Sequence, residues 1–115
     1  MRAIYKICTV AEWADAEKAG WFKGSAIDHK DGFIHFSTCE QIAETAAKYF
    51  AVVGDLVLVK VDADRLGPNL IWEPARGGSL FPHLYGALDA AMATWVKDLP
   101  DGEARAAFLA RLPGA

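Results

Sequence analysis

The chain has 115 residues, 53% of them hydrophobic, with four Trp, six Phe and three Tyr, so we expect a single domain over residues 1–115 that folds without metal or disulfide support. Twelve basic against fifteen acidic residues give a net charge of −3 without a basic stripe, which argues against a nucleic-acid partner. The start has no secretory signal pattern and the sequence has no apolar run of membrane length, so we expect a cytoplasmic protein with no membrane partner.

The first third of the chain is expected to form a strand, a helix, a loop and a second strand. Residues 2–8 are aromatic and β-branched, which favours a strand. Thr9 and Glu12 have the spacing of a capping box, which predicts a helix start. Residues 21–32 are rich in Gly, Asp and Ser, which predicts an ordered loop, and FIHFS at 33–37 predicts the next strand.

The middle of the chain predicts an amphipathic helix and a buried strand. Thr38 and Gln41 form a second capping-box pattern. The next segment has mainly apolar residues at helical spacing on one face, with one threonine among them: Ile42, Thr45, Ala46, Tyr49 and Phe50. LVLVKV at 56–61 is almost continuously apolar, which predicts a central strand covered on both faces.

The last third predicts short strands and a closing helix. LIW at 70–72 is expected to be a strand that ends at Pro74, and a Gly-rich loop then leads to a short strand over 83–85. MATWV at 92–96 predicts the last strand. The closing helix is expected to bury a stripe of Ala104, Phe108 and Leu112.

The strand at 33–37 carries the first candidate site. Side chains alternate along a strand, so His35 and Ser37 share one face. A helix that begins directly after Ser37 would aim free backbone amides at the same place, which suits a phosphate or another anion. The alternative is a core histidine with a hydrogen-bonded neighbour, and Ser37 as a helix cap.

The segment from 73 to 85 carries the second candidate site. Arg76 offers a bidentate cation, and Gly77 and Gly78 allow the backbone to approach a ligand closely. Glu73, His83 and Tyr85 lie within the same thirteen positions, and His83 and Tyr85 share a face if this stretch is extended. The alternative for Arg76-Gly77-Gly78 is a surface turn.

Several other chemistries have no sequence support. His29, His35 and His83 do not occur in HxH, HExxH or His-plus-Cys patterns, so no metal is expected. Cys8 and Cys39 do not form a CxxC pair and are expected to be core thiols. GxSxG, P-loop and GxGxxG motifs are missing from the sequence.

Four blocks in matching order, IYKI, GSAIDHKDGFIHFSTCEQIAET, LVLVKVDADRL and WEPARGGSLFPHLYG, resemble the bacterial family known as domain of unknown function 952. The resemblance covers roughly residues 2–96. That family is similar in fold to the ADP-ribosyltransferase superfamily. It therefore implies an α+β, ADP-ribosylation-like fold, in which two small packed sheets with flanking helices enclose an NAD-binding cleft.

The resemblance also implies roles for individual residues. His35-Phe36-Ser37 is similar to the histidine and hydroxyl pair that holds the riboses of NAD in those transferases. Tyr85 resembles the aromatic residue that stacks on nicotinamide, and Arg76 would then hold the pyrophosphate. The expected set of ligand-contacting residues is Ser25, Asp28, His35, Ser37, Arg76, Gly77, Gly78, His83 and Tyr85.

One departure bears on catalysis. These transferases carry a catalytic glutamate on a late strand, but the late strand MATWV has none, which leaves Glu73 as the candidate. The leading hypothesis is a domain that binds NAD or a related nucleotide, with transfer or hydrolysis of ADP-ribose as a second step. Two alternatives stay open: a non-catalytic module for a small anionic metabolite, and an acid–base enzyme that uses His35 and His83.

Overall fold

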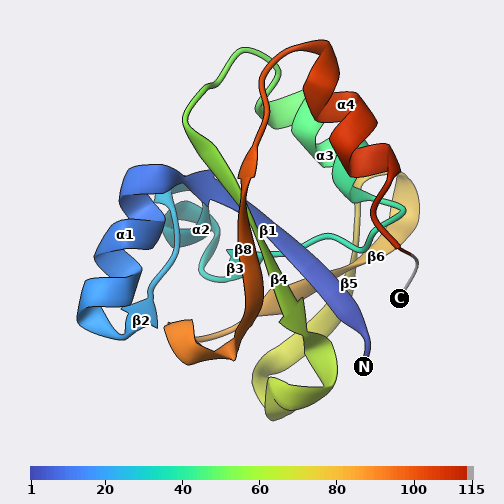
Figure 1. Ribbon diagram of the computed structural model, residues 1–115. Helices are drawn as coiled ribbons and strands as arrows, with labels where there is room; N and C mark the ends of the chain where they lie inside the picture. The colour runs from blue at the N-terminus through green and yellow to red at the C-terminus, as the bar shows by residue number, and fades with distance from the viewer. Residues whose placement is uncertain (114–115) are drawn as a thin grey trace.

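The computed structural model describes residues 1–113, apart from the side chain of Arg76. The largest sheet is antiparallel, with strand order β1-β4-β8, and comprises β1 (Ala3–Thr9), β4 (Leu56–Asp62) and β8 (Ala93–Leu99). In Figure 1 these three strands cross the middle of the molecule. The expectation of a central strand at 56–61 is confirmed, and the strand expected at 92–96 extends to Leu99.

Strand β4 is buried on both faces because a separate apolar cluster covers each one. Val57, Val59 and Val61 pack in one cluster with Ile4, Cys8 and Phe36. Leu56 and Leu58 pack in the other with Tyr5 and Ile42. The period of two along a strand divides its side chains between these clusters, which explains the continuously apolar sequence.

Helix α1 (Val10–Ala19) has the expected capping box: the Glu12 amide donates to Thr9 Oγ1 over 3.0 Å and the Thr9 amide donates to Glu12 Oε1 over 2.8 Å. The expected loop at 21–32 is wrong. It holds β2 (Trp21–Phe22), which pairs with β7 (Leu88–Asp89), and the six-residue helix α2 (Ala26–Asp31). Ser25 and Gly32, which suggest turns in the sequence, are the N-cap and C-cap of this helix. The helix is also too short to show a periodic apolar face.

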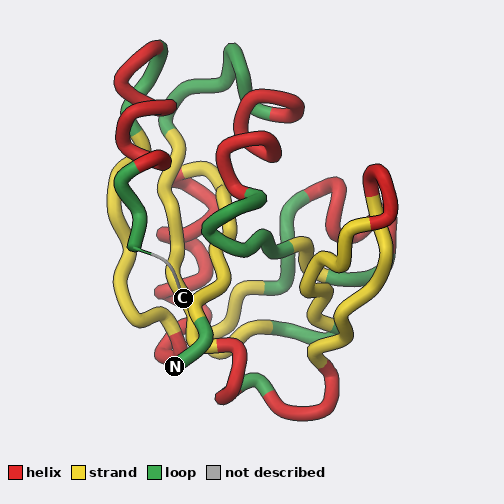
Figure 2. The backbone as a smooth tube through the Cα atoms, turned by 90° about the vertical axis from the view of Figure 1, so that its right-hand side faces the viewer, coloured by secondary structure: helices red, strands yellow, loops and turns green. Residues whose placement is uncertain are grey.

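A second three-stranded antiparallel sheet has the order β3-β6-β5, with β3 (Ile34–His35), β6 (Ser79–Leu84) and β5 (Leu70–Ala75). The side view in Figure 2 shows this sheet apart from the first sheet. Strand β5 continues past Pro74 because it is an edge strand, where a missing N–H is tolerated. The strand expected at 83–85 begins earlier, at Ser79.

The strand expected at 33–37 is shorter than the sequence indicates, because only two of its residues pair with β6. Ser37 instead forms an isolated bridge with Tyr5 of β1, with backbone N···O distances of 2.8 and 2.9 Å. This bridge joins the two larger sheets. Counting the β2-β7 ribbon, residues 1–113 form three antiparallel sheets rather than the expected two, and the α+β class is confirmed.

Helix α3 (Ile42–Tyr49) begins after a turn at 38–41, so the expectation of a helix starting directly after Ser37 is wrong. Helix α4 (Glu103–Ala110) lies beside α3 in Figure 1 and buries Arg105 and Leu109 instead of Ala104. Four 3-10 turns complete the described elements: η1 (Ala63–Arg65), η2 (Gly67–Asn69), η3 (Arg76–Gly78) and η4 (Ala90–Met92). Over residues 1–113, every helix is too short or too polar to cross a bilayer.

Candidate functional site

A cleft of about 570 Å³ lies where the two larger sheets meet, between α2, α3 and the β3-β6-β5 sheet. Aromatic and aliphatic side chains form most of its wall, and imidazole, hydroxyl and charged groups lie among them. Its polar lining residues are Tyr5, Lys6, Asp31, His35, Ser37, Thr45, Tyr49 and His83. Mostly apolar walls with a few convergent polar groups are typical of small-molecule sites.

The lining residue Lys6 forms a buried ion pair with Asp28. Lys6 Nζ is 2.9 Å from Asp28 Oδ1 and 2.8 Å from Oδ2, and the two side chains are 4% and 1% exposed. Burial of the Asp28 carboxyl raises its pKa, but the hydrogen bond from His35 and the charge of Lys6 lower it to a net value of about 2. Asp28 is therefore ionised throughout the physiological range.

Asp28 also fixes the start of α2. The Ser25 amide donates to Asp28 Oδ2 over 2.8 Å. Gly24 has φ +109°, and a Cβ built there would lie 2.8 Å from the Asp28 Cβ. Only glycine meets both conditions without strain, so Gly24 lets the carboxylate approach the backbone.

Both ring nitrogens of His35 contact carboxylates. Nδ1 is 2.6 Å from Asp28 Oδ1, and Nε2 is 2.9 Å from Asp31 Oδ2. The backbone amide of His35 donates to Asp28 Oδ1 over 3.1 Å. Asp28 therefore holds the imidazole in place from the protein interior, whereas the contact with Asp31, whose side chain is 37% exposed, lies near solvent.

His83 has a different carboxylate partner. Its Nδ1 is 2.8 Å from Glu73 Oε1, and the Tyr85 hydroxyl donates to the same oxygen over 2.7 Å. The hydrogen bonds from Tyr85 and His83 lower the pKa of Glu73, and the bond to Glu73 raises the pKa of Tyr85. Glu73 and Tyr85 are not among the lining residues of the cleft, so they lie behind His83.

Phe33 holds the two histidine rings together. Its ring stacks on His83 with centroids 4.0 Å apart and lies 4.6 Å from His35. The centroids of His35 and His83 are 5.6 Å apart, because the two residues face each other in the β3–β6 register. The Tyr85 ring also contacts Phe33, with centroids 5.2 Å apart.

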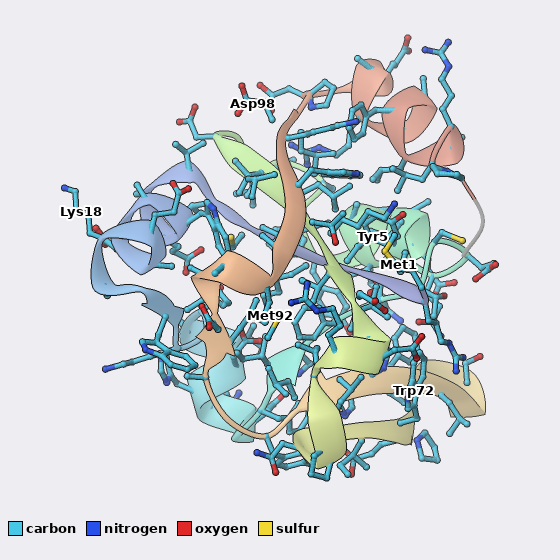
Figure 3. The ribbon with its side chains drawn as sticks, turned by 60° about the horizontal axis from the view of Figure 1, so that its bottom comes forward. Met1, Tyr5, Lys18, Trp72, Met92 and Asp98 are labelled. Atoms are coloured by element: carbon cyan, nitrogen blue, oxygen red, sulfur yellow. The ribbon has the colours of Figure 1, made fainter. Side chains whose placement is uncertain are left out.

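Hydroxyl groups line the part of the cleft nearest α3. Ser37 Oγ and Thr45 Oγ1 are 2.9 Å apart. The Tyr5 hydroxyl is buried and has no hydrogen-bond partner within the described part of the chain. Burial and the nearby Cys39 raise the pKa of this hydroxyl. In Figure 3 Tyr5 lies within the outline of the molecule, whereas Lys18 projects from its edge.

The residues proposed from the sequence fall into three groups. His35, Ser37 and His83 line the cleft together, and Ser25 and Asp28 support His35 from beneath. Glu73 and Tyr85 form the group behind His83. Gly77 and Gly78 lie in η3, directly after the lining residue Ala75. The backbone of Arg76 belongs to the same turn, but its side chain lies outside the described residues.

The sequence analysis did not identify Lys6 or Phe33 as site residues. It assigned Asp31 to the expected loop at 21–32. Lys6 could have been found, because it stands between hydrophobic residues in a predicted strand. A lysine in that position is either exposed at the edge of a sheet or buried with a charged partner. The partner comes from a helix 22 positions away, and no local pattern indicates that contact.

Two further observations concern ligands. Residues 1–113 contain no group of three or more His, Cys, Asp or Glu side chains arranged to hold a metal ion. A second hollow, of about 520 Å³, lies between β8 and α4, and its polar side chains are Lys97 and Arg111. Because the imidazoles and paired carboxylates gather at the first cleft, that cleft is the candidate site.

Comparison with known proteins extends these observations. The crystal structure of protein CC0527 from Caulobacter crescentus, a structural-genomics target, is 50% identical, aligns over 88% of this chain and 89% of that one, and has a TM-score of 0.86. The solution NMR structure of CC0527 is 49% identical over 90% of each chain, with a TM-score of 0.80. No curated protein matches the chain. The model of the family described as "Protein of unknown function (DUF952)" matches residues 7–96, and the chain therefore belongs to the DUF952 family.

Proposed function

We propose that the cleft binds NAD or a related nucleotide, with His35 and Ser37 on a ribose and the apolar wall against a base. The observation that carries this proposal is the presence of His35 and Ser37 in one apolar-walled cleft of about 570 Å³. The ring N–H groups of His35 can donate hydrogen bonds, and the Ser37 hydroxyl can both donate and accept them, which matches the adjacent hydroxyls of a ribose. The aromatic side chains of Phe33, Tyr49 and Phe81 in the wall suit a flat ring.

An ADP-ribosyltransferase-like fold is part of the same proposal. It is supported by the resemblance in the FIHFS and RGGSLFPHLYG blocks and by a cleft that lies between sheets. Arg76 follows the lining residue Ala75 in the chain, and the resemblance implies that it holds the pyrophosphate.

Transfer or hydrolysis of ADP-ribose would give Glu73 an indirect role. Its carboxylate contacts His83 and Tyr85 and does not line the cleft, so it acts on a ligand through the orientation of His83. Glu73→Gln is then expected to lower NAD turnover and to leave NAD affinity within about twofold. Equal turnover in this variant and the wild type would remove Glu73 from the reaction.

Calorimetric titration tests the binding proposal. NAD, ADP-ribose, 3′-AMP and citrate are titrated separately into the wild type and into His35→Ala, Ser37→Ala and His29→Ala. His29 is the matched control, because it is an exposed histidine on α2 outside the cleft lining. Far-UV circular dichroism verifies that each variant is folded.

We expect micromolar binding of at least one nucleotide, weakened roughly 10- to 100-fold in His35→Ala and unchanged in His29→Ala. Binding of citrate without any nucleotide would replace the proposal with the anionic-metabolite module. Nucleotide binding that is equal in all variants would place the ligand elsewhere on the protein.

A further inference from the structure

We propose that the cleft is also a catalytic acid–base site, with His83 as proton acceptor and His35 as proton donor, that hydrolyses an ester of a ribose hydroxyl such as a nucleoside 2′,3′-cyclic phosphate. The choice of substrate rests on the proposed nucleotide binding, whereas the assignment of the two histidines rests on their own contacts. The two parts are therefore tested separately.

His83 is held as a base. A neutral imidazole carries one N–H and one lone pair, and the nitrogen that faces a carboxylate is the one that keeps the proton. Nδ1 faces Glu73 Oε1 at 2.8 Å, which leaves the lone pair on Nε2. Nε2 has no hydrogen-bond partner among the described side chains, and His83 lines the cleft. A carboxylate behind an imidazole is a common arrangement for a general base.

His35 is held as an acid. Each of its ring nitrogens lies within 2.9 Å of a carboxylate oxygen, and an imidazole satisfies two acceptors only when both nitrogens carry protons. The Lys6–Asp28 pair fixes the inner side of the ring. Asp31 is 37% exposed, so a substrate oxygen can replace it at Nε2 with little loss, because exposed ion pairs contribute little stability.

The two rings differ in their carboxylate partners but lie at the same place in the cleft. Their centroids are 5.6 Å apart at an interplanar angle of 68°, and Phe33 contacts both. The cross-strand register of His35 and His83 fixes their separation. A bond that needs a proton taken from water and a proton given to a leaving oxygen suits such a pair.

The reaction balances without a further reactant. Water attacks the phosphorus of the cyclic ester and gives a proton to His83 Nε2, while the bond from phosphorus to one ribose oxygen breaks. That oxygen takes the proton from His35 Nε2, and the product is a nucleoside monophosphate with a free hydroxyl. Exchange with solvent then returns a proton to His35 and removes one from His83.

Diethyl pyrocarbonate tests the assignment of the histidines without any nucleotide. It transfers an ethoxycarbonyl group to an unprotonated imidazole nitrogen and releases ethanol and carbon dioxide, and peptide mass spectrometry locates the adducts. We expect adducts on His83 and on the exposed internal standard His29. His35 should be spared although it is more exposed than His83, because carboxylates occupy both of its ring nitrogens. Glu73→Gln removes the carboxylate that contacts His83 Nδ1, so it should slow modification of His83 and leave that of His29 unchanged. Modification of His35 in preference to His83 would overturn the assignment.

Hydrolysis of adenosine 2′,3′-cyclic phosphate, followed by ³¹P NMR, tests the activity. We expect turnover in the wild type and in His29→Ala, and a loss of about 10²- to 10⁴-fold in His83→Gln and His35→Gln. Glu73 is a positioning residue, so Glu73→Gln should lower kcat and leave KM unchanged. Binding of 3′-AMP without turnover would overturn the catalytic proposal alone, whereas failure of every nucleotide to bind would overturn the proposed function.

Discussion

Asp28→Asn should destabilise the fold more than most substitutions in this protein. Two carboxylate oxygens accept hydrogen bonds from four groups: Lys6 Nζ, the Ser25 amide, and the amide and Nδ1 of His35. Asparagine has nearly the same shape but one acceptor oxygen. Whichever way it turns, its NH₂ group faces a donor, and the Lys6 ammonium stays buried without an anion.

The magnitude follows from that unpaired charge. Breaking a buried ion pair by removing one partner costs about 3–5 kcal/mol, a large share of the roughly 5–15 kcal/mol that stabilises a domain. Lys6→Met should cost less, about 1–3 kcal/mol, because Asp28 keeps its bonds from Ser25 and His35 and can take up a proton. The double variant Lys6→Met/Asp28→Asn should recover part of the loss, since it leaves no buried charge behind.

Urea denaturation followed by Trp fluorescence measures these differences. Trp13 is 4% exposed in the core, so its emission reports unfolding. In thermal unfolding followed by the same fluorescence, Asp28→Asn should lower Tm by roughly 12–20 °C, at roughly 4 °C per kcal/mol. A loss below about 1 kcal/mol in Asp28→Asn, or a double variant that is no more stable than Asp28→Asn, would refute the argument from the buried charge.

Three further outcomes are expected. The folded pKa of Asp28, about 2, is below its usual 3.8, so this group's stabilisation is complete above the higher value and is lost as pH falls towards the lower one. Urea titrations should show a loss of about 2 kcal/mol between roughly pH 4 and pH 2. Arg105→Met should cost about 2–4 kcal/mol in the same assay, because this buried side chain donates to the carbonyls of Phe50, Val53 and Pro100. Burial raises the pKa of the Cys8 thiol to about 12, so iodoacetamide at pH 8 should leave Cys8 unmodified in the folded protein, as mass spectrometry would record.

Each of these expectations has a contrary result. Asp28→Asn should remove most of the loss of stability at acidic pH. If the variant and the wild type have the same dependence of stability on pH, other carboxylates cause that loss. Asp101 is the control for Arg105, because its contact with that guanidinium is largely exposed, and equal losses in Asp101→Asn and Arg105→Met would contradict the role given to the carbonyls. Alkylation of Cys8 at the rate measured in urea would show that the first sheet opens readily.

The elements that the sequence predicts correctly are those with strong local signals. The capping box at Thr9 and Glu12 and the apolar period from Ile42 to Phe50 depend on contacts within a few residues, and both helices form. The apolar run at 56–61 needs cover on both faces, which only a central strand supplies. Where the local signal is short or ambiguous, as at 21–32 and 33–37, the sequence misleads, because a two-turn helix and a two-residue strand depend on their tertiary partners.

The candidate site divides in the same way. Alternation along a strand already places His35 with Ser37, and the sequence also draws Glu73, His83 and Tyr85 into one segment. It does not bring the two groups together, because that contact depends on the β3–β6 register and on the ring of Phe33. Nor does it pair Lys6 with Asp28. These contacts join distant parts of the chain. The packing of the two sheets and α2 determines which polar groups lie together in the interior, and it also determines which charged group neutralises each of them.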